Sequence, residues 1–228
     1  MTIFKFVIVR SLRRKSMLIS MCALPIAMAF MSPMWDLETG GGLGVYGMMI
    51  MFCAFSLSQF IMNDRVNGTA VRIFSAPITT FQYLSQNLLA FWVMLSVQIT
   101  LVLGLVSFLH DWDTLMSAYI IFAYIIFTTS CISFSLAWNS IFRSKLMSTS
   151  VFSVIIGFMG LLGGVFVPIE ELPNMLRIIG MLFPTYWLSS SLNIILTQEM
   201  TVQFWMYIGI MILFSFAFLL YGSKRRLS

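Results

Sequence analysis

The stretch Leu115–Phe142, LMSAYIIFAYIIFTTSCISFSLAWNSIF, contains no charged side chain. A helix crosses the apolar interior of a bilayer with about 20 residues, so this stretch is long enough to span a membrane. Hydrophobic residues make up 60% of the 228 residues and charged residues 9%. A soluble domain has about 25% charged residues, because its surface must stay mostly polar. The other apolar runs are approximately Met17–Trp35, Val45–Met62, Tyr83–Leu109, Met147–Val167 and Val202–Tyr221. The sequence therefore predicts an all-α integral membrane protein with six transmembrane helices.

The first run has a competing interpretation as a secretory signal. Residues 27–29, AMA, have the small-x-small form of a cleavage site. However, the apolar core of a signal has about 7–15 residues, and Met17–Trp35 is longer. The preceding residues 1–16 are partly amphipathic, with one apolar helical face that consists of Phe4, Val7, Ile8 and Leu12. We therefore expect an interfacial helix on the membrane surface, followed by a retained span.

The positions of the charged residues give an orientation. With the N-terminus in the cytosol, the inner segments hold twelve of the thirteen basic residues, all except Arg177, and seven of the eight acids lie outside, all except Asp64. The opposite orientation would reverse both counts, against the positive-inside rule. We therefore expect a multi-pass protein of the cell membrane with both termini in the cytosol. The apolar runs between the basic clusters exclude the single basic face of a nucleic-acid-binding protein.

This orientation divides the chain into segments. The expected parts are a cytosolic amphipathic helix (1–16), a six-helix transmembrane domain (17–222) and a basic cytosolic tail (223–228). Within the domain, 63–77 is cytosolic and 168–199 is extracellular. The extracellular segment contains a short amphipathic stretch and a moderately apolar stretch, Pro184–Thr197, which is too short and polar to cross and is interpreted as re-entrant or interfacial. A loop is expected at 40–44, GGGLG, before the second span.

The expected spans carry no ionisable group in their interiors. This absence counts against a proton-coupled carrier, which needs a group that binds and releases protons at membrane depth. Sodium coupling through neutral oxygens stays open. The chain also lacks a phosphate-binding loop, a Ser/His/Asp set and a metal cluster, so we expect no enzymatic activity, no metal and no cofactor in this chain. The three cysteines, Cys22, Cys53 and Cys131, lie in apolar runs and are interpreted as small buried hydrophobic residues. Energy for driven transport would have to come from another chain.

A polar segment between the second and third spans could receive that energy. Residues 64–77, DRVNGTAVRIFSAP, begin with an acid–Arg pair, continue through Gly68-Thr69 and stop at Ala76-Pro77. A short amphipathic turn there would present Arg72 and its apolar neighbours to a cytosolic partner. The alternative is an ordinary loop whose arginines only anchor the chain at the membrane surface.

The pattern acid-Arg-x-x-Gly-Thr-x-x-Arg-x-x-Ser-x-Pro resembles the cytosolic loop of ABC-2 type permeases, the membrane subunits of ATP-binding-cassette exporters. A second block is similar to the C-terminal signature of that family: residues 163–168, GGVFVP, then Leu172-Pro173, then residues 184–187, PTYW. Together the two motifs and the span count extend the resemblance over essentially the whole chain. One departure is Asp64, where the family often has Glu.

The resemblance implies a division of labour between chains. Two permease subunits, identical or sister chains, would pair around a two-fold axis, and cytosolic ABC ATPase subunits would bind ATP and Mg. The interfacial helix would be the connecting helix, and the coupling residues would be Asp64, Arg65, Gly68, Thr69 and Arg72. The signature residues of the extracellular segment would be Gly163, Gly164, Pro168, Pro173 and Pro184. The ATPases would drive cargo out of the cell by alternating access between inward- and outward-facing states.

The only indication of the cargo in the sequence is the chemistry of the expected spans, which are rich in Met and Phe. Such spans, with membrane lipid around them, would suit an amphipathic or hydrophobic cargo, such as a drug, an antimicrobial peptide or a lipid. Neutral polar residues near membrane depth could bind cargo or could equally bond helix to helix: Gln59, Gln86, Asn87, Gln98 and Asn139. The small-xxx-small pair Gly160/Gly164 favours close packing, with a dimer axis as the alternative. An ion-gradient-driven carrier and a non-transporting scaffold or sensor also stay open.

Overall fold

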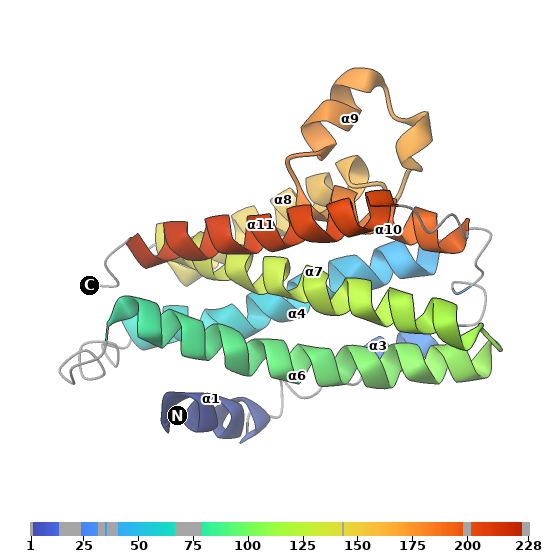
Figure 1. Ribbon diagram of the computed structural model, residues 1–228. Coiled ribbons are helices and arrows are strands. Elements are labelled where there is room, and N and C mark those ends of the chain that lie inside the picture. Colours follow the sequence, from blue (N-terminus) through green and yellow to red (C-terminus); the bar gives the residue numbers. More distant parts are fainter. Residues whose placement is uncertain are drawn as a thin grey trace.

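The computed structural model describes residues 2–13, 24–31, 35, 41–66, 79–142, 144–197 and 202–224. In these ranges all regular secondary structure is helical. The long helices lie side by side in one bundle, and the start of α1 (Thr2–Arg13) and the end of α11 (Val202–Lys224) lie at the same end of it (Figure 1). We call this end the α1 end. The predicted fold class, an all-α membrane protein, is confirmed at this level.

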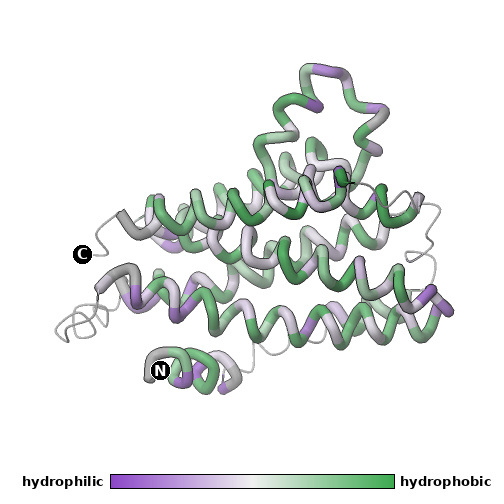
Figure 2. The backbone as a smooth tube through the Cα atoms, viewed as in Figure 1, coloured by the Kyte–Doolittle hydropathy of each residue, from purple (hydrophilic) through white to green (hydrophobic). Residues whose placement is uncertain are grey.

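Five helices in the described ranges are long and apolar enough to cross a membrane. They are α4 (Gly41–Val66), α6 (Thr80–Leu109), α7 (Thr114–Ile141), α8 (Lys145–Leu162) and α11. A bent pair, α9 (Asn174–Gly180) and α10 (Pro184–Leu196), makes a sixth candidate if it counts as one span. Of the expected first span, Met17–Trp35, the structure describes only α3 (Leu24–Ala29), residues 30–31 and Trp35. Figure 2 shows apolar residues along the helices and polar residues at the ends of the bundle.

Local capping explains where two of the long helices begin. The Thr79 hydroxyl accepts a hydrogen bond from the Gln82 amide, and the Gln82 side chain accepts one from the Thr79 amide, both at 3.2 Å. This capping box starts α6. The Asp113 carboxylate accepts bonds from the Leu115 and Met116 amides at 3.1 Å and starts α7. The amides of a first helical turn have no partner within the helix, so these side chains supply one.

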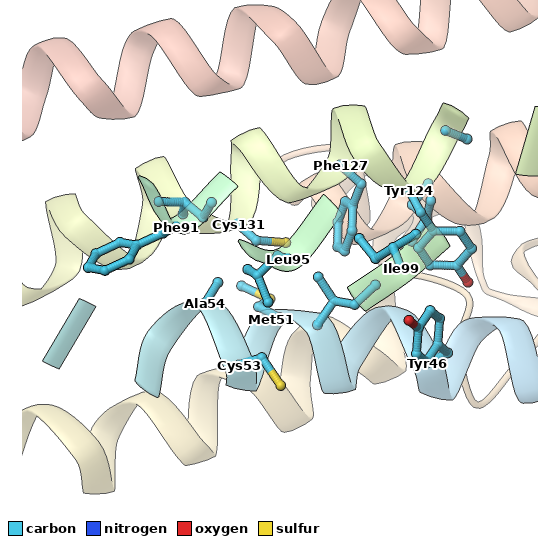
Figure 3. Close-up of a cluster of buried hydrophobic side chains, with 14 of the residues drawn as sticks. Tyr46, Met51, Cys53, Ala54, Phe91, Leu95, Ile99, Tyr124, Phe127 and Cys131 are labelled. Atoms are coloured by element: carbon cyan, nitrogen blue, oxygen red, sulfur yellow. The ribbon is translucent and has the colours of Figure 1, made fainter. Parts of the chain in front are cut away.

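Helix α7 lies at the centre of the bundle and packs against α4, α6, α10 and α11. Its Tyr124, Phe127 and Cys131 side chains are fully buried. Figure 3 shows them beside buried side chains of α4 and α6. The Ser130 hydroxyl donates to the Met211 carbonyl at 2.6 Å and so joins α7 to α11. Because lipid gives helices no hydrophobic reason to associate, such packing and hydrogen bonds hold the bundle together.

Two boundaries differ from the sequence prediction. The expected loop at 40–44 is helical from Gly41 onward, as the first turn of α4. Glycine disfavours a helix by about 1 kcal/mol, but packing overrides this preference: a Cβ at Gly44 would lie 3.1 Å from Val165 Cγ1. The fifth run was expected to continue to Val167, and the structure ends α8 at Leu162, before the turn at Gly163.

Helix α1 packs on the bundle through one face. Val7 belongs to the protein core, Phe4 and Ile8 are partly buried against that core, and α1 contacts mainly α6. Ser11 is buried on the same side. The opposite side carries Phe6 and Val9, which are exposed. Part of the apolar face expected for this helix thus lies against the protein, and the position of α1 at the membrane surface stays a prediction.

Candidate functional site

Three helices meet at the Asp64 side chain, near the α1 end of the bundle. Asp64 lies on the last turns of α4 and is buried, with 5% of its surface exposed. Arg10 Nη1 of α1 lies 2.7 Å from Asp64 Oδ1 and donates a hydrogen bond of 2.9 Å to Oδ2. The Tyr83 hydroxyl of α6 donates to the same Oδ2 at 3.1 Å. We call these three side chains the Asp64 joint.

Two members of this joint lie in or near the predicted coupling segment, 63–77: Asp64 is within it, and Tyr83 follows it. Helix α4 continues through Val66, and α6 begins at Thr80, so Asp64 and Tyr83 flank residues 67–78. The Arg10 guanidinium also lies 5.3 Å from the centroid of the Phe60 ring, one turn before Asp64. A buried carboxylate is stable as a charge only when it is paired and hydrogen-bonded. Arg10 therefore supplies the opposite charge, and Arg10 and Tyr83 supply the hydrogen bonds, that the buried Asp64 carboxylate needs.

The predicted coupling residues lie partly outside the described structure. Asp64 is described, and its carboxylate faces Arg10 and Tyr83 within the chain. Arg65 belongs to α4, but its side chain lies outside the described residues, as do Gly68, Thr69 and Arg72 entirely. Their coupling role stays a prediction. Sequence reasoning missed Arg10 and Tyr83. The available signal was Asp64 itself, the one acid on the basic side of the orientation count.

Further into the bundle, a buried polar cluster joins α4, α7 and α8. Asn139 Oδ1 accepts hydrogen bonds from Gln59 Nε2 at 3.1 Å and from the Ser148 hydroxyl at 2.8 Å. Asn139 Nδ2 donates to the Ser58 hydroxyl at 2.6 Å. Two of the neutral polar residues singled out from the sequence, Gln59 and Asn139, are thus bonded helix to helix. We call these four side chains the Asn139 cluster.

The other neutral polar residues form no such cluster. Asn87 Nδ2 donates to the Tyr83 carbonyl within α6 at 2.8 Å. Among the described residues, both polar atoms of the buried Gln98 side chain lack a hydrogen-bond partner, as does Gln86 Oε1. Gln59 Oε1 of the Asn139 cluster lacks one as well. An unpartnered buried amide is costly, so Gln98, with neither atom bonded, is the least well satisfied of these three side chains.

The two signature glycines make the turn after α8. A Cβ at Gly163 would overlap the Thr185 side chain and the Met159 carbonyl. The Thr185 hydroxyl donates to that same carbonyl at 3.0 Å, so α10 is bonded to the end of α8 at this point. Gly164 has φ +79°, a left-handed conformation that glycine adopts without a steric penalty. Gly163 allows the close approach and Gly164 allows the turn.

The three signature prolines each precede or open a helical piece. Pro168 comes directly before the 3-10 helix η3 (Ile169–Glu171), Pro173 directly before α9, and Pro184 is the first residue of α10. Proline suits these positions because its fixed φ fits the first turn and it has no amide to leave unpaired. Helices α9 and α10 meet at 104°. Figure 1 shows α9 standing out from the bundle beyond α8.

The Gly160/Gly164 pair packs within the chain. A Cβ at Gly160 would lie 2.6 Å from Met48 Sδ of α4 and 2.7 Å from Phe166 Cε2. A Cβ at Gly164 would lie 2.5 Å from Ile169 Cγ1. In contrast, Gly157 has nothing within 4 Å of such a Cβ. Both glycines therefore lie against side chains of this chain, and the dimer axis stays open as the alternative.

The described residues contain no group of three or more His, Cys, Asp or Glu side chains that could hold a metal ion. Cys53 and Cys131 are buried in the core. The ionisable group brought into a defined constellation at the α1 end is Asp64, and its partners position helices. This arrangement ties α1, α4 and α6 to one another next to residues 67–78 in the sequence.

Comparison with protein families finds one family model that covers both Asp64 and the glycine turn. The model of the ABC-2 family transporter proteins matches residues 39–224, which include both Asp64 and the block from Gly163 to Pro184. The chain belongs to the ABC-2 transporter family. A search of curated proteins found no match. The predicted resemblance is confirmed.

Family membership fixes the coarse role of this ABC-2 permease. It is a multi-pass membrane component of a transport system, and such components are generally not catalytic themselves. The family also implies an ABC ATPase partner in general. In this permease Asp64 and Tyr83 of the joint lie on either side of residues 67–78 in the sequence, and the coupling role of this region stays a prediction.

Proposed function

We propose that this ABC-2 permease moves an amphipathic or hydrophobic cargo out of the cell, driven by separate cytosolic ABC ATPase subunits that bind ATP and Mg. The observation that carries the proposal is the Asp64 joint, which ties α1, α4 and α6 together next to residues 67–78. In the proposed orientation the α1 end faces the cytosol, in the cell membrane. An ATPase that pushes on 67–78 would therefore move three helices at once.

The joint supports this role because its contacts connect α1, α4 and α6, so that these helices would move together. The Arg10–Asp64 hydrogen bond connects α1 to α4, and the Tyr83–Asp64 hydrogen bond connects α6 to α4. Charge-assisted hydrogen bonds are short and directional, so they transmit a displacement better than apolar contacts. A displacement of residues 67–78 would therefore be passed to α1, α4 and α6 together.

The Asn139 cluster would carry the motion further. It bonds α4 to α7 and α8 through Gln59, Asn139 and Ser148. A shift of α4 along its axis would therefore reach helices that have no described contact with 67–78. Packed interfaces and hydrogen-bond networks tend to change between discrete arrangements, which suits a switch between inward- and outward-facing states.

The cargo class rests on the chemistry of the helices. Exposed apolar side chains on α8, including Val154 and Phe158, leave a surface that lipid or a second permease subunit would cover. The second subunit would be an identical copy or a sister chain. A path between two such apolar surfaces suits a drug, an antimicrobial peptide or a lipid, because flexible Met and Phe side chains adapt to varied shapes.

A charge-exchange experiment tests the coupling. The permease is reconstituted with its ATPase in vesicles, and ATP-dependent cargo movement is compared for wild type, R10D, D64R and the double exchange R10D/D64R. We expect each single change to lower transport at least ten-fold and the double exchange to recover a substantial part. Lys145→Ala, at an exposed position at the start of α8, is the matched control and should retain transport. Equal transport by wild type and both single variants would contradict the coupling role.

A further inference from the structure

Helix α1 has a second face that the joint does not use. Its inner face packs on α6, with Val7 and Ser11 buried. At 100° per residue, Lys5, Phe6, Val9 and Arg13 fall on the opposite side. All four are exposed, Phe6 by 62% and Val9 by 42%. We call these four side chains the outer face of α1.

The outer face combines two cations with two apolar side chains. Lys5, Val9 and Arg13 follow one another at intervals of four residues, so the two charges flank Val9 along one line of the helix. No acidic residue occurs in α1. Its remaining cation, Arg10, is engaged by Asp64. The outer face therefore presents a net positive charge beside exposed apolar surface.

The position of α1 decides which partner this face meets. Helix α1 lies beside α6, on the flank of the bundle, and not beyond its end (Figure 1). Because the inner face is turned to α6, the outer face points away from the bundle. A cytosolic ATPase would approach beyond the end of the helices, whereas a lipid leaflet surrounds the flank. Basic side chains with apolar neighbours suit the headgroup region of a leaflet.

We propose that the outer face of α1 binds anionic phospholipid in the inner leaflet and thereby holds α1 in the position that the Arg10–Asp64 contact requires. Lys5 and Arg13 would pair with lipid phosphates, while Phe6 and Val9 insert at the level of the glycerol and upper acyl groups. The proposal rests on the orientation given under the proposed function. It adds a regulator, since the lipid charge sets how firmly α1 is seated.

The test places a fluorophore on the outer face of the full-length chain. A nitrobenzoxadiazole label is attached at Val9→Cys in a Cys22→Ala background, since Cys53 and Cys131 are buried. The labelled permease is reconstituted, without ATPase or nucleotide, in phosphatidylcholine vesicles with or without phosphatidylglycerol. Quenching by a nitroxide on the lipid headgroup is compared with quenching by aqueous iodide.

In vesicles with phosphatidylglycerol we expect quenching by the lipid nitroxide and protection from iodide. Each basic residue near an anionic surface strengthens binding about five-fold, so K5Q/R13Q should shift the label toward iodide access by about 25-fold. The exchange K5R/R13K should keep the lipid contact, and Lys145→Gln should leave it unchanged. Circular dichroism of each variant verifies that the helices are intact.

Equal access of iodide in both lipids, or an equal loss in Lys145→Gln, would overturn the proposal. A second sample with the ATPase added is measured in parallel, and protection that develops only in that sample would overturn the proposal and assign the face to the ATPase. Because the first sample contains no ATPase or nucleotide, its result does not depend on ATP-driven transport. A permease that binds lipid as expected but shows no ATP-driven transport would contradict the proposed function alone.

Discussion

Arg10 and Asp64 lie 54 positions apart in the sequence, and their side chains meet at 2.7 Å. This contact joins the first helix of the permease to the end of α4, where the predicted coupling segment begins. The Asp64 carboxylate is buried and the Arg10 side chain keeps 32% of its surface exposed. The pair therefore combines a carboxylate that needs a partner with an arginine that could also remain solvated.

Removal of one partner should destabilise the permease more than removal of both. Arg10→Gln leaves a buried carboxylate without its cation, and we expect a loss on the order of 2 kcal/mol, between the values for surface and buried pairs. The double variant R10Q/D64N removes the unpaired charge and should recover part of that loss. Thermal unfolding in detergent measures both effects. Additive losses in the double variant would show that the two side chains do not interact.

Tyr83→Phe isolates the third member of the joint. The variant removes only the hydroxyl that donates to Asp64 Oδ2 at 3.1 Å and keeps the ring in place. A lost hydrogen bond to a charged group costs about 1.5–3 kcal/mol. We expect a lower melting temperature than wild type and reduced ATP-dependent transport. Tyr119→Phe on α7 provides a tyrosine control, because Tyr119 makes an edge contact with Phe204 through its ring. A melting temperature equal to that of the control would contradict the role of the Tyr83 hydroxyl.

The close packing at Gly163, after the end of α8, predicts that alanine there has a different effect from alanine at Gly157. Gly163→Ala would place a Cβ against Thr185 and the Met159 carbonyl, and overpacking of this kind costs about 1–3 kcal/mol. Gly157→Ala adds the same methyl group where nothing lies within 4 Å, and it should be neutral or stabilising, since alanine favours a helix. Melting temperatures of the two variants, measured under the same conditions, test this difference in stability. A Gly163→Ala variant as stable as Gly157→Ala would rule out the close approach.

The Asn139 cluster predicts a similar contrast within the membrane. Asn139→Ala leaves Gln59 and Ser148 without an acceptor, and we expect a loss of about 1 kcal/mol, because hydrogen bonds between helices in membranes are modest. Thr100→Ala on α6 removes a hydroxyl that, in the described part of the chain, bonds within its own helix to the Ser96 carbonyl. It should be nearly neutral. Equal melting temperatures for the two variants would show that the cluster does not hold α4, α7 and α8 together.

Much of the fold could be predicted because the membrane imposes simple requirements on the chain. The uncharged run around Tyr124 had to form a helix, since only a helix satisfies its own backbone in lipid. The expected start of the last span, Val202, coincides with the start of α11. The start of α4 was harder to predict, because the packing of Gly44 on Val165 overrides the usual preference of glycine for a loop.

The site was less predictable, for a physical reason. The family motif pointed to Asp64, but the choice of Arg10 among the basic residues of the N-terminal region depends on how α1 packs. Helical periodicity identified an apolar face on α1, and it could not show whether lipid or protein covers that face. The glycine turn was marked by its motif, whereas the contact between Gly163 and Thr185 depends on the 104° bend between α9 and α10.

Co-purification of an ATPase tests the ATP-driven role most directly. The tagged permease is purified from its native host, and ATPase activity is measured on the proteins that accompany it. A variant with residues 67–75 in scrambled order keeps Asp64 and α4 intact and serves as the comparison, with its fold verified by circular dichroism. We predict that wild type recovers a phosphate-loop ATPase and that the scrambled variant does not. A folded wild-type permease that recovers no such ATPase, or a scrambled variant that recovers it equally well, would contradict the account.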